Sequence, residues 1–193
     1  MAFSTHFRAL VCSNNITTAM IVHCKLIFSG LLPDVINSNH LMSMYAKRGL
    51  LHHARCLFDQ MPHWNVVSCS ILINAYAKIG SPMKAIDCFR SMVSNGLEPN
   101  GFPYVGILSA CGSLGAVNSS KEIHGRIYRF EHVSNSYLNN SLVNSYSKCG
   151  LVSSARKVFD EMRQPNLISW SSMIAGYSHS GEHAEALAIF SWA

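Results

Sequence analysis

The sequence has little charge and no long apolar run. Only 13% of its 193 residues are charged, whereas 49% are hydrophobic. A membrane-spanning helix needs about 18 or more consecutive apolar residues, and the sequence contains no such run. We therefore expect no membrane partner. The formal net charge of +5 is a mild cationic excess, which suits a polyanionic partner but does not require one.

The sequence also lacks the cysteine motifs of common metal sites. Its seven cysteines form no CxxC pair, and their spacings match no common zinc ligand set. The cysteines are Cys12, Cys24, Cys56, Cys69, Cys88, Cys111 and Cys149. Most fall at helix positions predicted to be buried, so we interpret them as small core residues in a reducing compartment. We expect no metal and no other cofactor.

The first 33 residues contain no acidic side chain, although they carry Arg8, Lys25 and several serines and threonines. This composition is typical of an organelle transit peptide. A degenerate repeat is the alternative, because Val22-His23 lies 101 residues before Ile123-His124. We favour the repeat, which leaves little room for a separate targeting segment.

When the sequence is aligned with itself at an offset of 101 residues, many positions are identical. The identities include Asn39/Asn140, Tyr45/Tyr146, Lys47/Lys148, Gly49/Gly150, Ala54/Ala155, Phe58/Phe159 and Asn65/Asn166. A period shared by adjacent blocks indicates an array of modules. The units are residues 1–34, 35–65, 66–100, 101–135, 136–166 and 167–193.

Each unit is predicted to form two helices. In residues 66–100, helix A ends at Gly80, and Ala85, Ile86 and Phe89 begin the apolar face of helix B. A lone hairpin cannot bury both apolar faces, so we expect an all-α solenoid of stacked antiparallel hairpins without a sheet. The predicted pairs are 36–47/51–61, 67–78/82–95, 102–113/117–130 and 137–148/152–162.

Three segments carry a family resemblance. "YAKRGLLHHARCLFDQMP", "YSKCGLVSSARKVFDEM" and "NVVSCSILINAYAKIGSPMKAIDCFRSMVSNGLEPN" resemble pentatricopeptide repeats, and "ILSACGSLGAVNSSKEIHGRI" resembles their long variant. The unit lengths are similar to those of the plant PLS subclass. On this basis 35–65 and 136–166 are short repeats, 66–100 is standard, 101–135 is long, 167–193 is a truncated standard repeat and 1–34 is a degenerate long one.

The resemblance implies a right-handed solenoid that binds single-stranded RNA in a mitochondrion or chloroplast. Proteins of this subclass take part in cytidine-to-uridine editing or other transcript processing, so other RNA-editing factors are possible partners. Neither a small-molecule substrate nor catalytic activity is expected. The rival hypotheses are a protein-binding helical-repeat scaffold and a truncated fragment without function.

The resemblance also implies that each unit recognises one base through two side chains, the fifth residue of helix A and the last residue of the unit. These residues are Asn39 with Asn65, Ser70 with Asn100, Asn140 with Asn166, and Ser171 alone. The long unit offers Val105 with Asn135, which lacks a hydrogen-bonding pair. A helix cap or turn residue is the structural alternative for any single Asn or Ser. Recurrence at one register favours base recognition.

Two further sets follow from the resemblance. The second residue of helix A is apolar in each unit and would sandwich a base, although ordinary packing explains it equally well. This set is Ile36, Val67, Phe102, Tyr137 and Ile168. Lys47, Lys78 and Lys148 end their A helices and would contact phosphates, although a lysine there also favours the helix dipole.

One segment imitates a catalytic motif. His183-Ala184-Glu185 matches the H-x-E of zinc deaminases, but no P-C-x-x-C follows it before Ala193. We assign it to the repeat scaffold. The sequence is expected to be a fragment of an editing-factor type of protein.

Overall fold

The computed structural model describes residues 17, 20–21, 23–25, 34–130 and 136–191, and within these residues it contains helices and no strand. The helices are α3 (Val35–Lys47), α4 (Leu51–Gln60), α5 (Val66–Lys78), α6 (Pro82–Ser94), α7 (Gly101–Leu114), α8 (Val117–Phe130), α9 (Ser136–Lys148), α10 (Val152–Asp160), α11 (Leu167–His179) and α12 (His183–Phe190). All predicted helices are present, with ends that differ by at most two residues. The expected all-α solenoid is confirmed.

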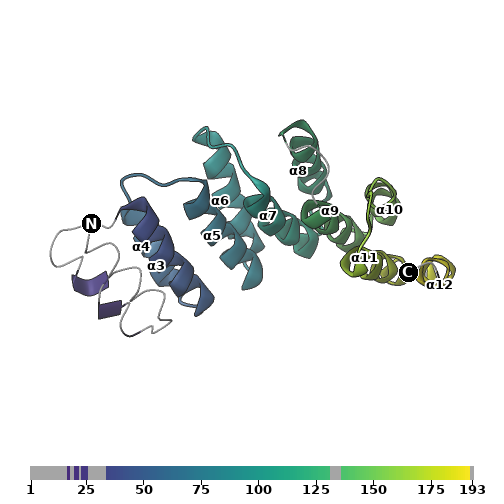
Figure 1. Ribbon diagram of the computed structural model, residues 1–193, viewed down its shortest axis with the longest axis horizontal. Coiled ribbons are helices and arrows are strands. Elements are labelled where there is room, and N and C mark those ends of the chain that lie inside the picture. The colour runs from purple at the N-terminus through teal and green to yellow at the C-terminus, as the bar shows by residue number, and fades with distance from the viewer. Residues whose placement is uncertain (1–16, 18–19, 22, 26–33, 131–135, 192–193) are drawn as a thin grey trace.

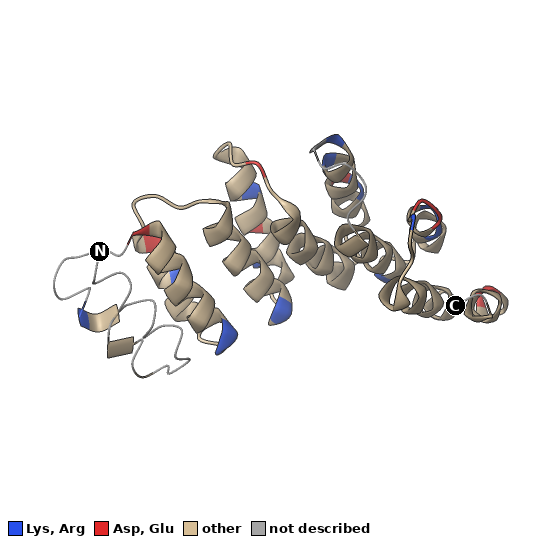
Figure 2. Cartoon of the chain, in the orientation of Figure 1, with Lys and Arg blue, Asp and Glu red and all other residues tan. Residues whose placement is uncertain are grey.

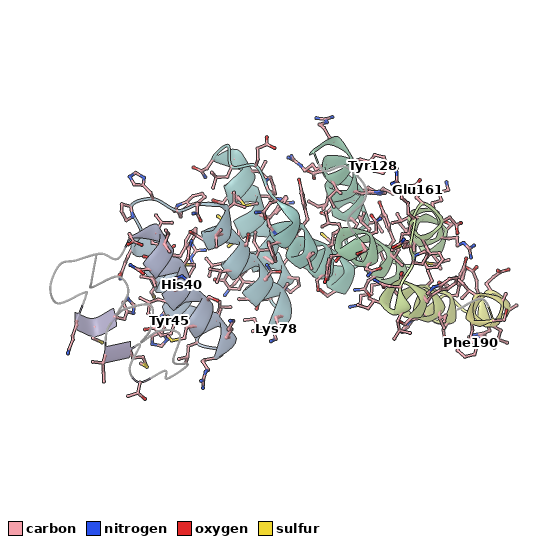
Figure 3. All side chains as sticks on the ribbon, viewed as in Figure 1. His40, Tyr45, Lys78, Tyr128, Glu161 and Phe190 are labelled. Carbon is pink, nitrogen blue, oxygen red and sulfur yellow. The ribbon has the colours of Figure 1, made fainter. Side chains whose placement is uncertain are left out.

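The helices form two layers. The odd-numbered helices α3, α5, α7, α9 and α11 pack one against the next in a continuous row. Each of α4, α6, α8 and α10 packs against the odd-numbered helix on either side of it in the chain, and α8 and α10 lie together on one side of the row (Figure 1). Tyr128 of α8 donates a hydrogen bond to Glu161 at the end of α10 over 2.8 Å (Figure 3). This bond and the shared position of α8 and α10 place both helices on the same side of the row.

A glycine in the left-handed conformation closes helix A at each hairpin. Gly80 has φ 74°, and the turn after it lets Ser81 donate its backbone N–H to the carbonyl of Tyr76 over 2.9 Å. This bond satisfies a carbonyl that the end of an α-helix otherwise leaves free. The predicted role of Gly80 is confirmed, and Gly49, Gly115, Gly150 and Gly181 adopt the same conformation.

The core lies between the two layers. Ala85, Ile86, Phe89 and Met92 of α6 are buried, as the spacing of helix B predicted, whereas Val93 of the same predicted face is half-buried. Phe89 packs against Tyr104 of the following helix A with ring centroids 5.9 Å apart. Such contacts bury the second apolar face that a single hairpin would leave in water.

A tyrosine–histidine hydrogen bond recurs after 101 residues. His23 Nδ1 lies 2.9 Å from the hydroxyl of Tyr45, and His124 Nδ1 lies 2.9 Å from that of Tyr146. Burial is the main cause that lowers the pKa of both imidazoles. The equivalence supports a degenerate repeat around His23. Most of residues 1–34 lie outside the described residues, so this assignment stays a prediction.

The prediction that most cysteines are buried is wrong for the described residues. Cys69 and Cys111 are buried, Cys56, Cys88 and Cys149 are partly buried, and Cys24 is exposed. The hairpin pattern predicts which face of a helix points to the core. It does not predict how much of a side chain is buried when that side chain lies at the edge of this face. Cys12 lies outside the described residues. In the described segments, each helix is too short or too polar to cross a membrane.

Candidate nucleic-acid interface

The asparagine that ends a unit caps the next helix A. Asn65 Oδ1 accepts the backbone N–H of Ser68 over 3.1 Å, and Asn100 Oδ1 accepts that of Phe102 over 3.3 Å. Asn166 Oδ1 likewise accepts from the backbone at the start of α11. The capping role that we considered as an alternative is therefore present. Capping also fixes the orientation of the side-chain amide. Because Oδ1 accepts the capping bond, Nδ2 of each of these exposed asparagines is left as a hydrogen-bond donor.

The structure brings two of the predicted pairs into direct contact. Asn39 Nδ2 donates to Asn65 Oδ1 over 3.2 Å, and Asn140 Nδ2 donates to Asn166 Oδ1 over 3.3 Å. Asn39 Oδ1 also accepts a hydrogen bond from the Ser68 hydroxyl over 2.7 Å. In these two units the fifth residue of helix A is thus held against the last residue of its own unit.

The predicted serines have their hydroxyl protons engaged. Ser70 donates from Oγ to the carbonyl of Val66 over 2.6 Å, and Ser171 donates to the carbonyl of Leu167. A hydroxyl that donates to its own helix still has lone pairs available. These positions therefore present hydrogen-bond acceptors, whereas the capping asparagines present donors.

Residues predicted for three different roles line one groove between α3, α5 and α7. The groove has a volume of about 600 Å³. Ser70 and Asn100 line it together with the apolar Val67 and Phe102 and the cationic Lys47 and Lys78. Ser70 comes from the middle of α5, and Asn100 and Phe102 come from the start of α7, so the packing of α5 against α7 assembles the site.

The apolar residues at the second position of helix A are exposed. The exposed fractions are 56% for Ile36, 50% for Val67, 75% for Phe102, 76% for Tyr137 and 59% for Ile168. Ordinary packing would bury such side chains. A row of exposed apolar residues on successive repeats instead marks a surface on which other apolar groups can stack.

The three predicted lysines are exposed at the ends of α3, α5 and α9. Figure 2 shows cationic residues at the lower ends of α3 and α5, and Figure 3 labels Lys78 there. The ion pairs found in the described part of the chain join Arg55 to Asp59, Arg126 to Glu122 and Arg156 to Asp160, and none includes these lysines. Their charges therefore remain available to an anion.

Sequence reasoning missed Asn74. Its Nδ2 donates to the carbonyl of Ser70 over 2.8 Å and to that of Phe102 over 3.3 Å, so it bridges α5 and α7 within the groove. Gly106 provides the space, because a Cβ there would lie 2.6 Å from Asn74 Oδ1. The sequence does contain a signal for this role, because Asn74 is a polar residue one helical turn after Ser70 and lies on the same face of the helix.

The remaining predicted positions add little to the site. Val105 is half-buried on α7, and its predicted partner Asn135 lies outside the described residues. His183 and Glu185 lie in the first turn of α12. Among the described residues, no three histidine, cysteine, aspartate or glutamate side chains gather to hold a metal ion.

Comparison with known proteins identifies the repeats. The profile described as PPR repeat family matches residues 65–113, and the profile described as PPR repeat matches residues 38–66, 140–167 and 168–191. A pentatricopeptide repeat-containing protein of Arabidopsis thaliana is 35% identical over 87% of this chain and 20% of its own length. A putative pentatricopeptide repeat-containing protein of the same plant, named mitochondrial, is 39% identical over 78% of this chain and 24% of its own length.

Solved structures show the same fold. The crystal structure of the pentatricopeptide repeat protein PPR10 from maize aligns with 96% of this chain and 28% of its own chain, with a TM-score of 0.74 and 20% identity. PPR10 in complex with an 18-nt psaJ RNA element aligns with 96% of this chain and 32% of its own, with a TM-score of 0.57 and 19% identity. The chain spans between 20% and 24% of the length of the two curated relatives described above.

Proposed function

This chain belongs to the pentatricopeptide repeat family, and on that premise we propose that it binds single-stranded RNA along the row of odd-numbered helices. The observation that carries the proposal is the shared groove of Val67, Ser70, Asn100, Phe102, Lys47 and Lys78. It combines an apolar stacking surface and cations, which bind single strands, with a hydrogen-bonding pair, which can recognise a base. The complex of PPR10 with an RNA element supports this function for a protein of the same fold.

In this proposal each base stacks between the apolar residues of adjacent units. Val67 and Phe102 flank the groove on α5 and α7, and both are at least half exposed. Aromatic and apolar side chains stack on any base, because every base has a π-face. Ile36, Tyr137 and Ile168 would serve the neighbouring slots in the same way.

Hydrogen bonds then select the base, one in each unit. Asn100 offers an N–H donor that suits the unprotonated ring nitrogen of adenine, and Ser70 offers an acceptor that suits the adenine amino group. The proposed order from RNA 5′ to 3′ is pyrimidine (Asn39/Asn65), adenine (Ser70/Asn100), any base (the long unit), pyrimidine (Asn140/Asn166) and a purine (Ser171). The division into short, standard and long repeats belongs to the same proposal.

Lys47, Lys78 and Lys148 would contact the phosphates. They are exposed, and each ends a helix of the row, so they can follow an extended backbone. Ser113 and His179 occupy the corresponding positions of α7 and α11. The row of lysines is therefore interrupted at the long unit.

The biological role that we propose is the recognition of organellar transcripts for editing or processing, without catalytic activity in this chain. Several relatives carry the word mitochondrial in their names, which supports a location in an organelle, and we propose a mitochondrion or a chloroplast. Other RNA-editing factors are the proposed partners. A longer protein would contain this chain as one RNA-binding segment, since its relatives are several times longer.

Substitution of Phe102 tests the proposal. Loss of one stacking contact costs about 1–3 kcal/mol per base, so Phe102→Ala should weaken binding to a matching single strand by about fivefold or more. Met83→Ala removes another exposed apolar side chain, on α6 outside the row, and should leave the affinity unchanged. Wild-type protein should prefer the single strand to a duplex of the same sequence. Equal affinity for single strand and duplex, or equal loss in both variants, would refute the proposal.

A further inference from the structure

A second cleft lies between α4, α5 and α6, away from the groove. It has a volume of about 460 Å³ and is lined by Phe58 of α4, Cys69 and Tyr76 of α5, and Cys88 of α6. Cys69 and Lys78 are separated by nine residues on α5, which places them about 180° apart around the helix. An occupant of this cleft would therefore not compete with one in the groove, where Lys78 lies.

The equivalent cleft 101 residues further along the chain is partly filled by tryptophan. Trp170 occupies the position of Cys69, beside Arg156 in place of Arg55. Its ring packs edge-on against Phe159, the equivalent of Phe58, with centroids 4.8 Å apart. The volume of that cleft is about 200 Å³. The same hairpin architecture thus accepts an indole at this position. Cys69 leaves space on its side of Phe58, whereas Trp64 packs against the Phe58 ring with centroids 5.4 Å apart.

The walls of the open cleft combine two aromatic rings and two thiols with a charged rim of Arg55, Lys84 and Asp87. Burial raises the pKa of the Cys69 thiol to about 12 and also raises that of Cys88, so both thiols are protonated near neutral pH. Arg55 is held by Asp59 at 2.8 Å and lies over the ring of Phe58. Its charge is therefore compensated and does not demand an anionic ligand.

We infer that the cleft between α4, α5 and α6 binds a planar aromatic ring of indole size, at the place where the equivalent unit inserts Trp170. The volume falls within the range of ordinary small-molecule sites. The ring would lie above Cys69 between Phe58 and Tyr76, and it would displace the Lys84 ammonium that now lies 5.8 Å from the centre of the Tyr76 ring.

Fluorine NMR with 5-fluoroindole tests the inference on the 193-residue chain. Wild-type protein should bind one molecule in the cleft. Cys69→Trp fills the cleft with an indole of its own and should weaken this binding at least tenfold, whereas Cys69→Ala should retain it. A second titration with N-acetyltryptophanamide separates the two sources of an indole. Binding of this probe indicates a tryptophan side chain of a protein partner, and binding of 5-fluoroindole alone indicates a small free ligand.

Two controls keep the result specific. Phe102→Ala removes the exposed aromatic ring of the groove and should leave 5-fluoroindole binding in the cleft unchanged. Circular dichroism should show that Cys69→Trp keeps its helical content. If Cys69→Trp misfolds, Cys69→Leu provides a smaller filling side chain, for which a weakening of several-fold is expected. Absence of saturable binding to wild type, or equal binding to wild type and the folded filled variants, overturns the inference.

Discussion

Asn39 donates a hydrogen bond from Nδ2 to Asn65 Oδ1, and 101 residues later Asn140 donates in the same way to Asn166 Oδ1. In both units the accepting oxygen also caps the next helix. The last residue of the unit therefore has a structural role and a free N–H donor at the same time. Structural capping and base recognition are compatible, because they use different atoms of one amide.

Replacement of Asn100 by Asp should switch the preferred base. Aspartate caps a helix about as well as asparagine, but it replaces the N–H donor with an acceptor. The second base should then change from adenine towards guanine. One good base contact discriminates by about 1–3 kcal/mol, so titrations with two RNAs that differ only at this base should show a change in preference of about fivefold or more.

The matched control is Asn118→Asp, which adds the same charge on the exposed surface of α8. It should weaken binding to both RNAs slightly and equally. The adenine RNA and the guanine RNA are compared for each protein. If the ratio of the two affinities is the same for Asn100→Asp and for wild type, base recognition at this position is contradicted.

Removal of Lys47, Lys78 and Lys148 together should flatten the salt dependence of RNA binding. Each phosphate contact contributes about 0.7 to the slope of log K against log salt for single strands, so the triple Ala variant should lose about two units of slope. Base preference should remain. The same number of charges is removed by a triple Ala variant of Lys84, Lys121 and Lys157, which are exposed on α6, α8 and α10. If both triple variants lose the same slope, the three lysines of the row have no special contact with RNA.

Loss of the cap at α11 should destabilise the C-terminal hairpin. Asn166 Oδ1 accepts the backbone N–H groups of Ile168 and Ser169 over 3.0 Å and 3.1 Å. Asn166→Ala should lower the free energy of unfolding by about 1 kcal/mol, measured in urea. Asn166→Asp keeps a capping oxygen and should stay within about 0.5 kcal/mol of wild type. Equal destabilisation by both variants would show that the capping bonds do not contribute to stability.

Two glycine-to-alanine changes should act in opposite directions. A Cβ at Gly106 would lie 2.6 Å from Asn74 Oδ1 and 3.0 Å from Ile73 Cγ2, whereas a Cβ at Gly125 would meet nothing within 4 Å. Gly106→Ala should destabilise the fold by about 1–3 kcal/mol. Gly125→Ala lies inside α8 and should stabilise it by about 0.5–1 kcal/mol. Thermal unfolding of the two variants provides the measurement, and a shift of both midpoints in one direction would contradict the packing described around Asn74.

Stability should fall as the pH is lowered from about 7 to 5. Burial lowers the pKa of His124 and of His23 below the usual value of about 6.5. Below that value the unfolded chain takes up protons that the folded chain does not, so acid favours unfolding. His124→Gln should reduce the slope of unfolding free energy against pH. An identical slope in the variant would mean that this imidazole does not couple folding to protonation.

Helices and turns were largely predictable because their signals are local. The stop at Gly80, the apolar spacing that starts at Ala85 and the 101-residue period are all contained in short stretches of sequence. Local backbone preferences and the need to bury one helix face translate such patterns directly into hairpins and their stacking. The pairing of Asn39 with Asn65 was implied by the family resemblance, and the structure shows these two side chains in contact.

The chemistry of the surface depended on contacts between units. Only the packing of α5 against α7 shows that Asn74 reaches the carbonyl of Phe102, that Gly106 makes room for it, and that the second-position side chains stay exposed. The cleft beside Cys69 appears in the same way, once three helices enclose it. The sequence by itself determined the repeated hairpins, because hydrophobic spacing and glycine turns act over a few residues. Only the tertiary structure decided which atoms of those hairpins contact each other and which remain free. These contacts depend on the distances between side chains that lie about one repeat apart in the sequence.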